Sequence, residues 1–368
     1  MIVAEITRTR LSLEKRQVVI VKGSVTLKDI AKECGVSTAT VSRALSGTGY
    51  VKSEVKEMIA ETANRLGYVT NFLNDSLKAS SSGLIGYITS DISNQYHISV
   101  ARGIESVISA KNYNLIVCSS NGDASIEMKY IRSLLSRNID ALIINPTCRN
   151  NVEIARLSHR LPVVSVNRRI ENPNFCGDFV DADNRSGIYA LTQYLAGAGH
   201  RRIYFIGGPP EFTNACERYE GFRSAMAEIG INVNLSYEYQ YQGDFSEQSG
   251  YDAIIYMIGH FSIQPTAIIA SNNALCIGAL KALYAQGLSV PEDYSVSCFN
   301  SINNSELFKV QPSVTDHSPV MIGQVAGRFA LERILDNTRG KQERIITPRL
   351  IPGNGVRSIP ALIEGGKT

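Results

Sequence analysis

Short apolar runs alternate with amphipathic stretches along most of the chain. Runs that are apolar throughout predict buried strands at residues 84–89, 114–120, 140–145, 162–167, 201–208, 266–271 and 294–300. Apolar positions at helical spacing predict helices at residues 97–111, 124–137, 184–198, 217–229, 246–259 and 274–287. Because buried strands separated by helices are typical of parallel sheets covered on both faces, we expect an α/β fold from residue 84 onward.

A different pattern, of three short helices, is predicted between residues 26 and 66. Thr26 and Asp29 have the spacing of a capping box, in which a hydroxyl and a carboxylate satisfy backbone amides at the start of a helix. The first helix is therefore expected to begin at Leu27 and to end near Glu33.

The second of these helices carries small, uncharged residues on its outer face. Ser37 is its expected N-cap, and Val36 can pack against Val41 across the first turn. Small side chains let a helix backbone approach base edges, hydroxyls can bond phosphates or bases, and an arginine can donate two hydrogen bonds to guanine or hold a phosphate. The inner face holds Val41, Ala44 and Leu45, and the outward or flanking positions hold Thr38, Ala39, Ser42, Arg43 and Ser46.

The third helix is expected to have Ser53 as its cap and Gly67 at its end. The short turn at residues 34–36 and the lengths of the helices that it joins are typical of a helix-turn-helix. From periodicity alone, a small three-helix bundle with a polar outer face and no role in DNA binding fits equally well.

Charge is concentrated at the N-terminus. The chain has 368 residues, of which 44% are apolar and 19% charged, and a net charge of +3. Residues 1–24 hold five basic and two acidic residues and so account for all of this charge. We interpret residues 1–24 as a disordered extension, with a phosphate-binding arm as the alternative. Because the rest of the chain carries no net charge, overall charge does not identify a nucleic-acid-binding protein. That interpretation depends on the helix-turn-helix pattern.

Cysteine use and motif content argue against an exported protein or an enzyme. The seven cysteines are scattered, with no C-x-x-C pair, which is typical of a reduced cytoplasmic protein. No apolar run near the N-terminus is long enough for a signal peptide or a membrane span. The sequence contains no phosphate-binding loop, zinc-protease motif or nucleophile elbow, and its five histidines are dispersed. We therefore expect no catalytic activity, metal, cofactor or membrane partner.

Two N-terminal stretches resemble the headpiece and hinge of the lactose-repressor (LacI/GalR) family of bacterial transcription regulators: SVTLKDIAKECGVSTATVSRALSG and GYVTNFLNDSLKA. Later stretches, such as DADNRSGIYALTQYLAGAGHRRIYFIGGP and TAIIASNNALCIGALKAL, also resemble that family in the same order. The resemblance implies an all-α helix-turn-helix headpiece and an α/β two-lobed, periplasmic-binding-protein-like effector domain with two doubly wound parallel sheets. The implied divisions are an extension (1–24), the headpiece (25–70), a hinge helix or linker (71–82), the effector domain (83–358) and a tail (359–368).

The resemblance also implies which residues contact operator DNA. The second helix lies in the major groove in this family, which gives base-reading roles to Thr38, Ala39, Ser42 and Arg43. Positions that contact the backbone or flank the site are Thr26, Ser37, Thr40, Ser46 and Tyr50. In the hinge, the matching residues are Asn71, Leu77 as a minor-groove wedge, and Lys78. The alternative for Leu77 is an apolar contact between paired hinge helices. Thr70 replaces the usual proline and Asn74 the usual alanine, which bears on how readily this hinge helix folds.

In the effector domain, the resemblance implies a ligand site between the lobes. Amides and arginine can chelate vicinal hydroxyls, and an aromatic ring can stack on a sugar face, so a sugar-like effector is expected. Asn273 and Asn300 replace two carboxylates that are frequent in the family, which allows a sugar acid or a phosphosugar. The implied effector residues are Asp91, Tyr96, Asn167, Arg218, Phe245, Asn272, Asn300 and His317.

Together these features predict a repressor of carbohydrate-utilisation genes that binds a near-palindromic operator as a homodimer. The tail has no heptad run, so the extra helix that tetramerises some relatives is expected to be absent. The principal alternative is a sugar-binding receptor of the same two-lobed fold without a DNA function, and an enzyme on a doubly wound fold is the second.

Overall fold

The computed structural model describes residues 25–46, 49–66, 81–233 and 237–360. Contacts within the chain divide it into two compact units between Ser80 and Ser81. This division falls inside the expected hinge at residues 71–82, and the part of that hinge before residue 81 lies outside the described residues.

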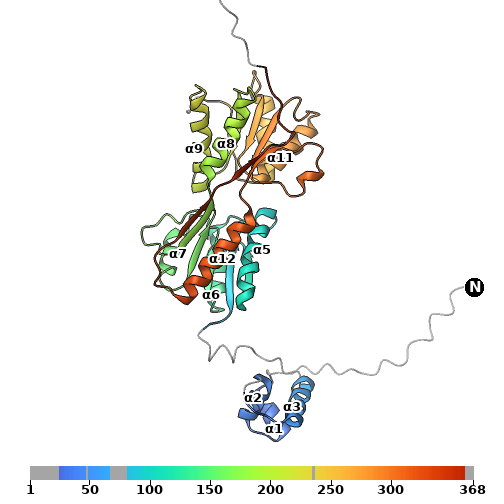
Figure 1. The fold of residues 1–368 in the computed structure, drawn as a ribbon, viewed down its shortest axis with the longest axis vertical. Helices are drawn as coiled ribbons and strands as arrows, with labels where there is room; N and C mark the ends of the chain where they lie inside the picture. Colours follow the sequence, from blue (N-terminus) through green and yellow to red (C-terminus); the bar gives the residue numbers. More distant parts are fainter. Residues whose placement is uncertain (1–24, 47–48, 67–80, 234–236, 361–368) are drawn as a thin grey trace, which may run out of the picture. The chain divides into compact units, whose positions relative to one another are not determined.

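Three helices surround one small apolar core in the N-terminal unit (Figure 1): α1 (Leu27–Cys34), α2 (Thr38–Ser46) and α3 (Ser53–Leu66). Each helix contributes two buried side chains, spaced so that they lie on one face of that helix. The buried residues of this core are Ile30, Ala31, Val41, Ala44, Ile59 and Ala63.

The start of α1 confirms the predicted capping box. The Asp29 carboxylate accepts hydrogen bonds from the backbone amide and the hydroxyl of Thr26, at 2.8 and 2.7 Å. α1 ends at Cys34, one residue later than expected, because Gly35 adopts a left-handed conformation (φ 65°) that a side chain would strain.

The start of α2 confirms its predicted cap, whereas the predicted start of α3 was wrong by one residue. The Ser37 hydroxyl accepts a hydrogen bond from the Thr40 amide at 3.1 Å. In α3, Ser53 is already helical, because the carbonyl of Lys52 accepts the first helical hydrogen bond, from Lys56, at 3.0 Å. Lys52 therefore occupies the cap position that the sequence assigned to Ser53.

Two six-stranded sheets form the C-terminal unit, and each is the centre of one lobe. The first lobe has the strand order β11-β5-β4-β3-β1-β2, with every pairing parallel. Its strands are β1 (Leu84–Thr89), β2 (Asn114–Ser119), β3 (Ala141–Ile144), β4 (Val163–Val166), β5 (Asp178–Ala182) and β11 (Glu343–Ile346). This arrangement confirms the doubly wound parallel sheet predicted from the sequence.

The second lobe has the strand order β12-β10-β9-β8-β6-β7. All its pairings are parallel except that of the edge strand β12, which runs antiparallel to β10. Its strands are β6 (Ile203–Gly207), β7 (Gln240–Gln242), β8 (Ala267–Ala270), β9 (Ser295–Phe299), β10 (Ser313–Asp316) and β12 (Arg349–Ile351).

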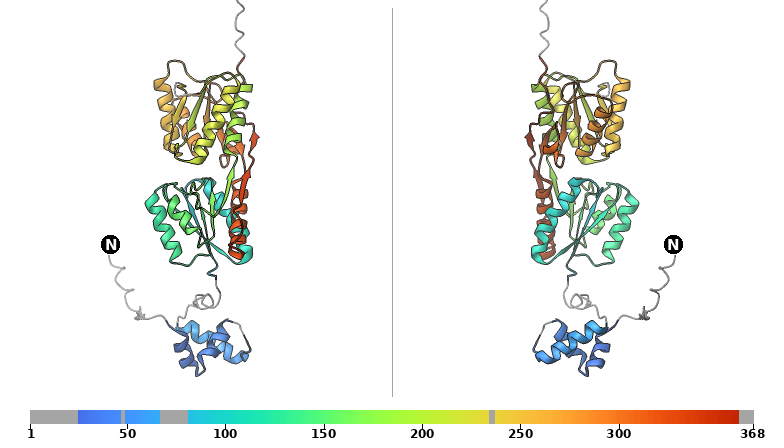
Figure 2. Two further views of the ribbon diagram at one scale, coloured as in Figure 1. Left: turned by 90° about the vertical axis from the view of Figure 1, so that its left-hand side faces the viewer. Right: turned by 90° about the vertical axis from the view of Figure 1, so that its right-hand side faces the viewer.

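Helices cover both faces of each sheet (Figures 1 and 2). Alternate strand residues enter different apolar clusters on opposite faces, so that each lobe has two cores, as expected for parallel sheets. In the first lobe, α5 and α12 lie side by side. The helices are α5 (Gln95–Ile108), α6 (Ala124–Leu135), α7 (Asn151–Leu157), α8 (Asn184–Gly197), α9 (Thr213–Glu228), α10 (Glu247–His260), α11 (Asn273–Ala285) and α12 (Pro319–Leu335), with short 3-10 helices η1 (Ser109–Lys111) and η2 (Ser305–Leu307).

The sequence pattern missed seven α-helices and strands of the C-terminal unit, and the short 3-10 helix η2 as well. The strands among them are short, and β5 contains two aspartates, so none forms a long apolar run. The seven missed α-helices and strands are α7, α12, β5, β7, β10, β11 and β12.

The chain passes three times between the lobes: from β5 to α8, from β10 to α12, and from β11 to β12. These three crossings form the hinge of the two-lobed unit. No helix among the described residues is both long and apolar enough to span a membrane.

Both ends of the C-terminal unit are held by hydrogen bonds. The Asp140 carboxylate accepts from the Ser81 hydroxyl at 2.9 Å, the Ser82 amide at 3.1 Å and the Gly83 amide at 2.7 Å. At the other end, the Ile359 amide donates to the carbonyl of Ala198 at 2.7 Å. These hydrogen bonds thus hold Ser81 of the expected linker and Ile359 of the expected tail against the unit.

Candidate DNA-binding surface and ligand cleft

The outer face of α2 is exposed and carries no carboxylate. α2 has no acidic residue, and its only charged side chain is that of Arg43. The Arg43 Nε donates to the carbonyl of Ala39 at 3.2 Å, which holds the arginine along the helix towards its amino end. Because a helix amino end attracts anions and small residues allow close approach, this face fits a phosphate backbone and base edges. Its exposed residues are Thr38, Ala39, Ser42 and Arg43.

The residues predicted to flank the DNA-binding face have different positions in the structure. Thr26 and Ser37 hold helix starts, and the Ser37 hydroxyl also lies 2.8 Å from that of Thr40. Tyr50 is 89% exposed and has no packing role that explains its ring. The remaining predicted DNA contacts lie outside the described residues or, for Ser46, have a side chain outside them: Ser46, Asn71, Leu77 and Lys78.

A cavity of about 520 Å³ lies between the two lobes, at the carboxyl ends of their strands. We call it the ligand cleft. Ligands of open parallel sheets bind at this edge, because the loops that leave the strands converge there. Seven of the eight predicted effector residues line the cleft: Asp91, Tyr96, Asn167, Arg218, Phe245, Asn272 and Asn300.

Tyr96 connects the eighth predicted residue, His317, to the cleft. The Tyr96 hydroxyl donates to Asn167 Oδ1 at 2.7 Å and lies 3.3 Å from His317 Nε2. Burial lowers the pKa of His317 to about 3, with a smaller effect from Arg218 in the same direction. His317 is therefore neutral at physiological pH and acts on the cleft through Tyr96.

Three cleft residues have left-handed backbone conformations, which asparagine tolerates better than other residues with side chains. Asn167 and Asn300 have φ values of 63° and 76°, and each follows directly after a strand. Phe245 has a φ of 71°, which is costly for a bulky residue. Strain of this kind is concentrated at binding sites, because the surrounding fold holds side chains in orientations that the site requires.

Phe245 is held in place from both sides. The Asn272 side chain donates to the Phe245 carbonyl at 3.0 Å and accepts from the Leu275 amide at 2.8 Å. Gly208 lies against the ring, and a Cβ at that position would be 2.1 Å from it. Asn272 thus uses its amide to position Phe245 and to cap α11, and Gly208 provides room for the ring.

Contacts between the lobes border the cleft on two sides. The side chains of Asn94 and Asn273 form a reciprocal amide pair, at 3.2 and 3.0 Å. On the other side, the Arg169 amide donates to the Thr213 hydroxyl at 3.1 Å. These contacts connect the first lobe with the second independently of the hinge.

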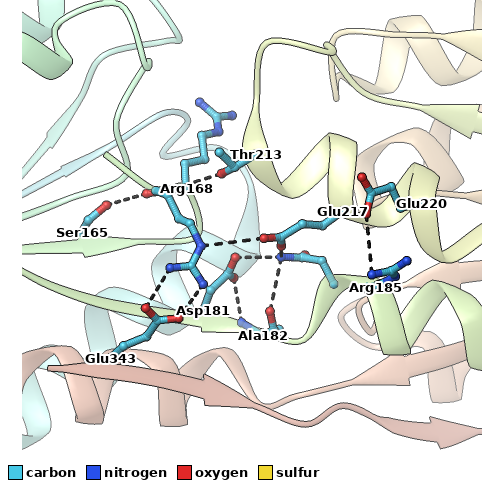
Figure 3. Close-up of polar contacts among 11 residues, drawn as sticks. Ser165, Arg168, Asp181, Ala182, Arg185, Thr213, Glu217, Glu220 and Glu343 are labelled. Atoms are coloured by element: carbon cyan, nitrogen blue, oxygen red, sulfur yellow. Dashed lines mark hydrogen bonds and ion pairs between the residues drawn. The ribbon is translucent and has the colours of Figure 1, made fainter. Parts of the chain in front are cut away.

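Asp181 lies behind the cleft in a network of polar groups that Figure 3 shows beside Ala182, Glu217 and Glu343. Its carboxylate accepts from the Ala182 amide at 2.7 Å and from the Asn184 side chain at 2.8 Å. Burial raises the pKa of Asp181 to about 7, and the nearby Arg218 opposes this effect only in part.

Sequence reasoning missed several residues of the cleft. Arg168 follows the predicted Asn167 directly, and its guanidinium lies 3.6 Å from the centre of the Phe212 ring. The sequence offered one signal for Arg168, its position directly after the predicted Asn167. It offered none for the other missed residues, because the fold brings them to the cleft from separate loops. The missed residues that line the cleft include His97, Asn121, Arg168, Phe212 and Asn214.

The helix-turn-helix unit and the two-lobed unit with its cleft define a DNA-binding regulator that responds to a ligand. Residues 26–71 match the model for "Bacterial regulatory proteins, lacI family", and residues 82–353 match "Periplasmic binding proteins and sugar binding domain of LacI family". The chain belongs to the LacI family of bacterial transcription regulators. It is therefore a regulator rather than an enzyme, and a receptor without a DNA-binding unit is excluded.

Similar proteins match over almost their whole length. The ribose operon repressor of Escherichia coli (strain K12) is 30% identical over 330 residues, which cover 89% of this chain and 98% of that protein. The transcriptional repressor PurR of Haemophilus influenzae (strain PittEE) is 29% identical over 339 residues, or 91% and 99% of the two chains. The fold resembles that of the lac repressor dimer bound to operator and an anti-inducer, with a TM-score of 0.75, 22% identity and coverage of 91% and 100%.

Proposed function

We propose that this protein represses genes for carbohydrate use in the cytoplasm, and that a sugar-like molecule in the ligand cleft controls its affinity for operator DNA. One observation carries the proposal: a single chain has an exposed, carboxylate-free helix face in one unit and a polar cleft between hinged lobes in the other. Relatives include a repressor of the ribose operon, and a transcriptional regulator of similar fold was solved in complex with cellobiose.

We assign base recognition to the exposed residues of α2 and positioning to the residues around it. Thr38 and Ala39 begin the helix and have small side chains, so they can approach base edges most closely. Arg43 can donate two hydrogen bonds to a guanine or bind a phosphate. Ser42 lies on the same exposed face and shares the base-reading role. The flanking roles fall to Thr26, Ser37, Thr40, Ser46 and Tyr50.

The hinge residues Asn71, Leu77 and Lys78 remain proposed minor-groove contacts. Asp140 supports a coupling of this hinge to the cleft, since it fixes the chain from Ser81 to Gly83 at the start of β1. A movement of the first lobe would therefore act directly on the linker segment at residues 71–82. In this proposal, ligand binding changes the relative population of lobe positions, and DNA affinity changes with it.

We place the homodimer contact on the second lobe, around α11 and η2. Three apolar side chains there are unusually exposed, with Leu307 at 80%, Tyr284 at 52% and Phe308 at 40%. Tyr284 and Phe308 also line a groove of about 1060 Å³ on this side of the lobe. A clustered apolar surface of this kind is typical of a protein contact, and a two-fold dimer requires a near-palindromic operator. Sedimentation equilibrium checks the assembly, and a monomer at micromolar concentration would contradict it.

A gel-shift assay with promoter DNA of the neighbouring genes tests the function. We expect a sequence-specific shift that changes on addition of the effector. Exchanging Thr38 and Ala39 for another pair should change the preferred operator by about 1–3 kcal/mol per base contact while ligand binding stays intact. Absence of a specific shift in every ligand state would overturn the proposal.

A further inference from the structure

Two buried guanidinium groups in the ligand cleft have no carboxylate partner. Arg168 and Arg218 are each 6% exposed, and both line the cleft. None of the ion pairs among the described residues includes either arginine. Arg168 donates to the carbonyl of Pro146 at 3.1 Å, and Arg218 donates to Asn184 Oδ1 at 2.9 Å and to the Ser271 carbonyl at 2.8 Å. These acceptors are all neutral.

Burial of these cations without an anion costs free energy. Burial lowers the pKa of Arg168 to about 10, and Arg218 has a further effect in the same direction; burial also lowers the pKa of Arg218. The Nε of Arg168 also has no hydrogen-bond acceptor. A buried charge is normally paired, so the site lacks the anion that would offset the cost of burial.

Two buried carboxyl groups, those of Glu127 and Asp181, compensate this charge incompletely. The oxygens of Glu127 accept hydrogen bonds from Thr147 and Asn150 rather than from an arginine. Asp181 acts on Arg218 electrostatically, but it makes no ion pair with that residue and uses its oxygens for Ala182 and Asn184. Burial raises the pKa of Asp181 to about 7, which reduces the negative charge that this residue supplies at neutral pH. The floor of the cleft therefore keeps a positive charge.

The other acidic residues that line the cleft lie towards solvent and are engaged in loop structure. Asp91 accepts hydrogen bonds from the amide and hydroxyl of Ser93, at 2.8 and 2.7 Å. Asp244 is exposed and accepts from the Ser246 amide at 2.9 Å. Water screens these carboxylates, so they oppose an anion at the floor only weakly.

Neutral polar atoms beside the arginines fit hydroxyl groups. Asn214 and Asn300 are buried, and the Oδ1 atom of each has no hydrogen-bond partner. His97 Nδ1 is likewise unpartnered, and burial lowers the pKa of this histidine to about 4, so it is neutral. A cavity of about 520 Å³ holds a small molecule with several hydroxyls.

We infer that the effector is a polyhydroxylated organic anion, either a sugar acid or a sugar phosphate, whose anionic group binds Arg168 and Arg218. The inference rests on the proposed role of the cleft as the effector site. Guanidinium groups bind carboxylates and phosphates through paired hydrogen bonds, and the two amide oxygens accept from hydroxyls on the same molecule.

Isothermal titration of the full-length protein with matched sets of compounds tests the charge. One set is D-ribose, D-ribonate and D-ribose 5-phosphate, and the other is D-glucose, D-gluconate and D-glucose 6-phosphate. In at least one set we expect an anion to bind about tenfold or more tightly than its neutral parent, and the carboxylate and phosphate members distinguish the two forms. Preference for the neutral parent, or no binding by any anion of the panel, would overturn the inference.

A charge-changing variant tests the location. Asn300→Asp puts a carboxylate on the cleft floor and should weaken anion binding about tenfold or more, and more than it weakens binding of the neutral parent sugar. Asn174→Asp adds the same charge at an exposed position outside the cleft and should bind the anion like the parent. Thermal unfolding checks that both variants fold, and if Asn300→Asp does not, Arg168→Gln should show the same loss. Unchanged anion affinity in the folded cleft variant would refute the location.

The outcomes separate this inference from the proposed function. A protein that shifts operator DNA but binds only neutral sugars would remain a repressor with a different effector class. A protein that binds an anion in the cleft but shifts no DNA would keep the ligand assignment and lose the repressor proposal.

Discussion

The two units carry their candidate functional residues in opposite ways. In the N-terminal unit, Thr38, Ala39, Ser42 and Arg43 are exposed neighbours on one helix and contribute nothing to the core. In the C-terminal unit, the cleft residues come from strand ends throughout both lobes, and most are buried or hold other residues in place. Recognition of DNA can therefore change without loss of stability, whereas the ligand site is part of what holds its fold together.

The largest expected difference between the units concerns their cores. Ile59 and Ile143 are both fully buried, but the first belongs to a cluster of six buried residues and the second to one of four larger clusters. Truncation of a buried isoleucine to alanine costs about 2–5 kcal/mol, which approaches the whole stability of a domain as small as the N-terminal unit. Ile59→Ala should therefore abolish operator binding, by about a thousandfold or more, and leave ligand binding intact.

Ile143→Ala is the matched control. It should lower the melting temperature of the C-terminal unit while both functions persist at 25 °C. Circular dichroism, gel shift and titration of each variant provide the measurements. Equal loss of DNA binding in the two variants would show that the units do not unfold independently.

Ion pairs provide a second contrast. Asp178 and Arg333 form a buried pair in the first lobe, with Nε–Oδ2 and Nη2–Oδ1 distances of 2.6 and 2.7 Å. The pair Glu33–Arg65 of the N-terminal unit is 3.1 Å long, but its side chains are 50% and 61% exposed. Asp178→Ala should cost about 3–5 kcal/mol, because it leaves a buried guanidinium unpaired. Glu33→Ala should cost less than about 1 kcal/mol.

Chemical denaturation of the two variants measures this contrast. The double variant Asp178→Leu/Arg333→Met removes both charges and should recover much of the stability lost in Asp178→Ala. If the double variant is no more stable than the single one, the loss comes from packing rather than from the unpaired charge.

The N-terminal unit was predictable from sequence because its determinants are local. Its caps at Thr26 and Ser37 and its core positions are within a few residues of one another, so helical spacing was sufficient. The error at Ser53 is one residue, which local chemistry does not resolve when two neighbouring residues can begin a helix. The strands of the C-terminal unit were predictable where they are apolar throughout, whereas β5 and α12 were not.

The cleft could be predicted only through a family resemblance. Its residues lie between positions 90 and 300, and no spacing rule places Asn94 beside Asn273. The sequence indicated the charge balance of the site only in part, because Asn273 and Asn300 replace two carboxylates that are frequent in the family. That Arg168 and Arg218 lack a carboxylate partner depends on burial and on which groups the fold brings near them.

The next contrast is the pH dependence of stability, to which the buried carboxyl group of Asp181 contributes in the C-terminal unit. The pKa of Asp181 is raised by burial from 3.8 to about 7, so the folded state binds a proton that the unfolded state releases between these values. Asp181 alone should therefore lower the free energy of unfolding of the C-terminal unit by about 2 kcal/mol between pH 5 and 7. The buried His97 and His317 act in the opposite direction, because burial lowers their pKa values from 6.5 to about 4 and about 3. The contribution of Asp181 is therefore measured as a difference between parent and variant.

The variant Asp181→Asn isolates that contribution. Whatever its absolute stability, its free energy of unfolding minus that of the parent should increase by about 2 kcal/mol between pH 5 and 7, because the histidines contribute equally to both proteins. Urea denaturation at each pH measures this difference. Identical pH slopes for parent and variant would mean that Asp181 titrates near its ordinary value in the folded protein.

The last contrast concerns the loss of one helix cap, which has the smallest expected energy. It should still shift the melting temperatures of the two units by different amounts. Ser37 caps α2 through the Thr40 amide, and Ser246 caps α10 through the Ser249 amide, each at 3.1 Å. Replacement of either serine by alanine should cost about 1 kcal/mol. The melting temperature shifts by the ratio of this energy to the entropy of unfolding, which grows with the number of residues that unfold together. Ser37→Ala should therefore lower the melting temperature of its unit by about 4–8 °C or more, and Ser246→Ala by about 2–4 °C.

Hydrogen exchange of the full-length protein during heating, read separately for peptides of each unit, measures both shifts. Because the two caps have the same geometry and the same chemistry, equal shifts would mean that the units unfold as one cooperative body, and the contrast between a small recognition unit and a large ligand-binding unit would not extend to their stability.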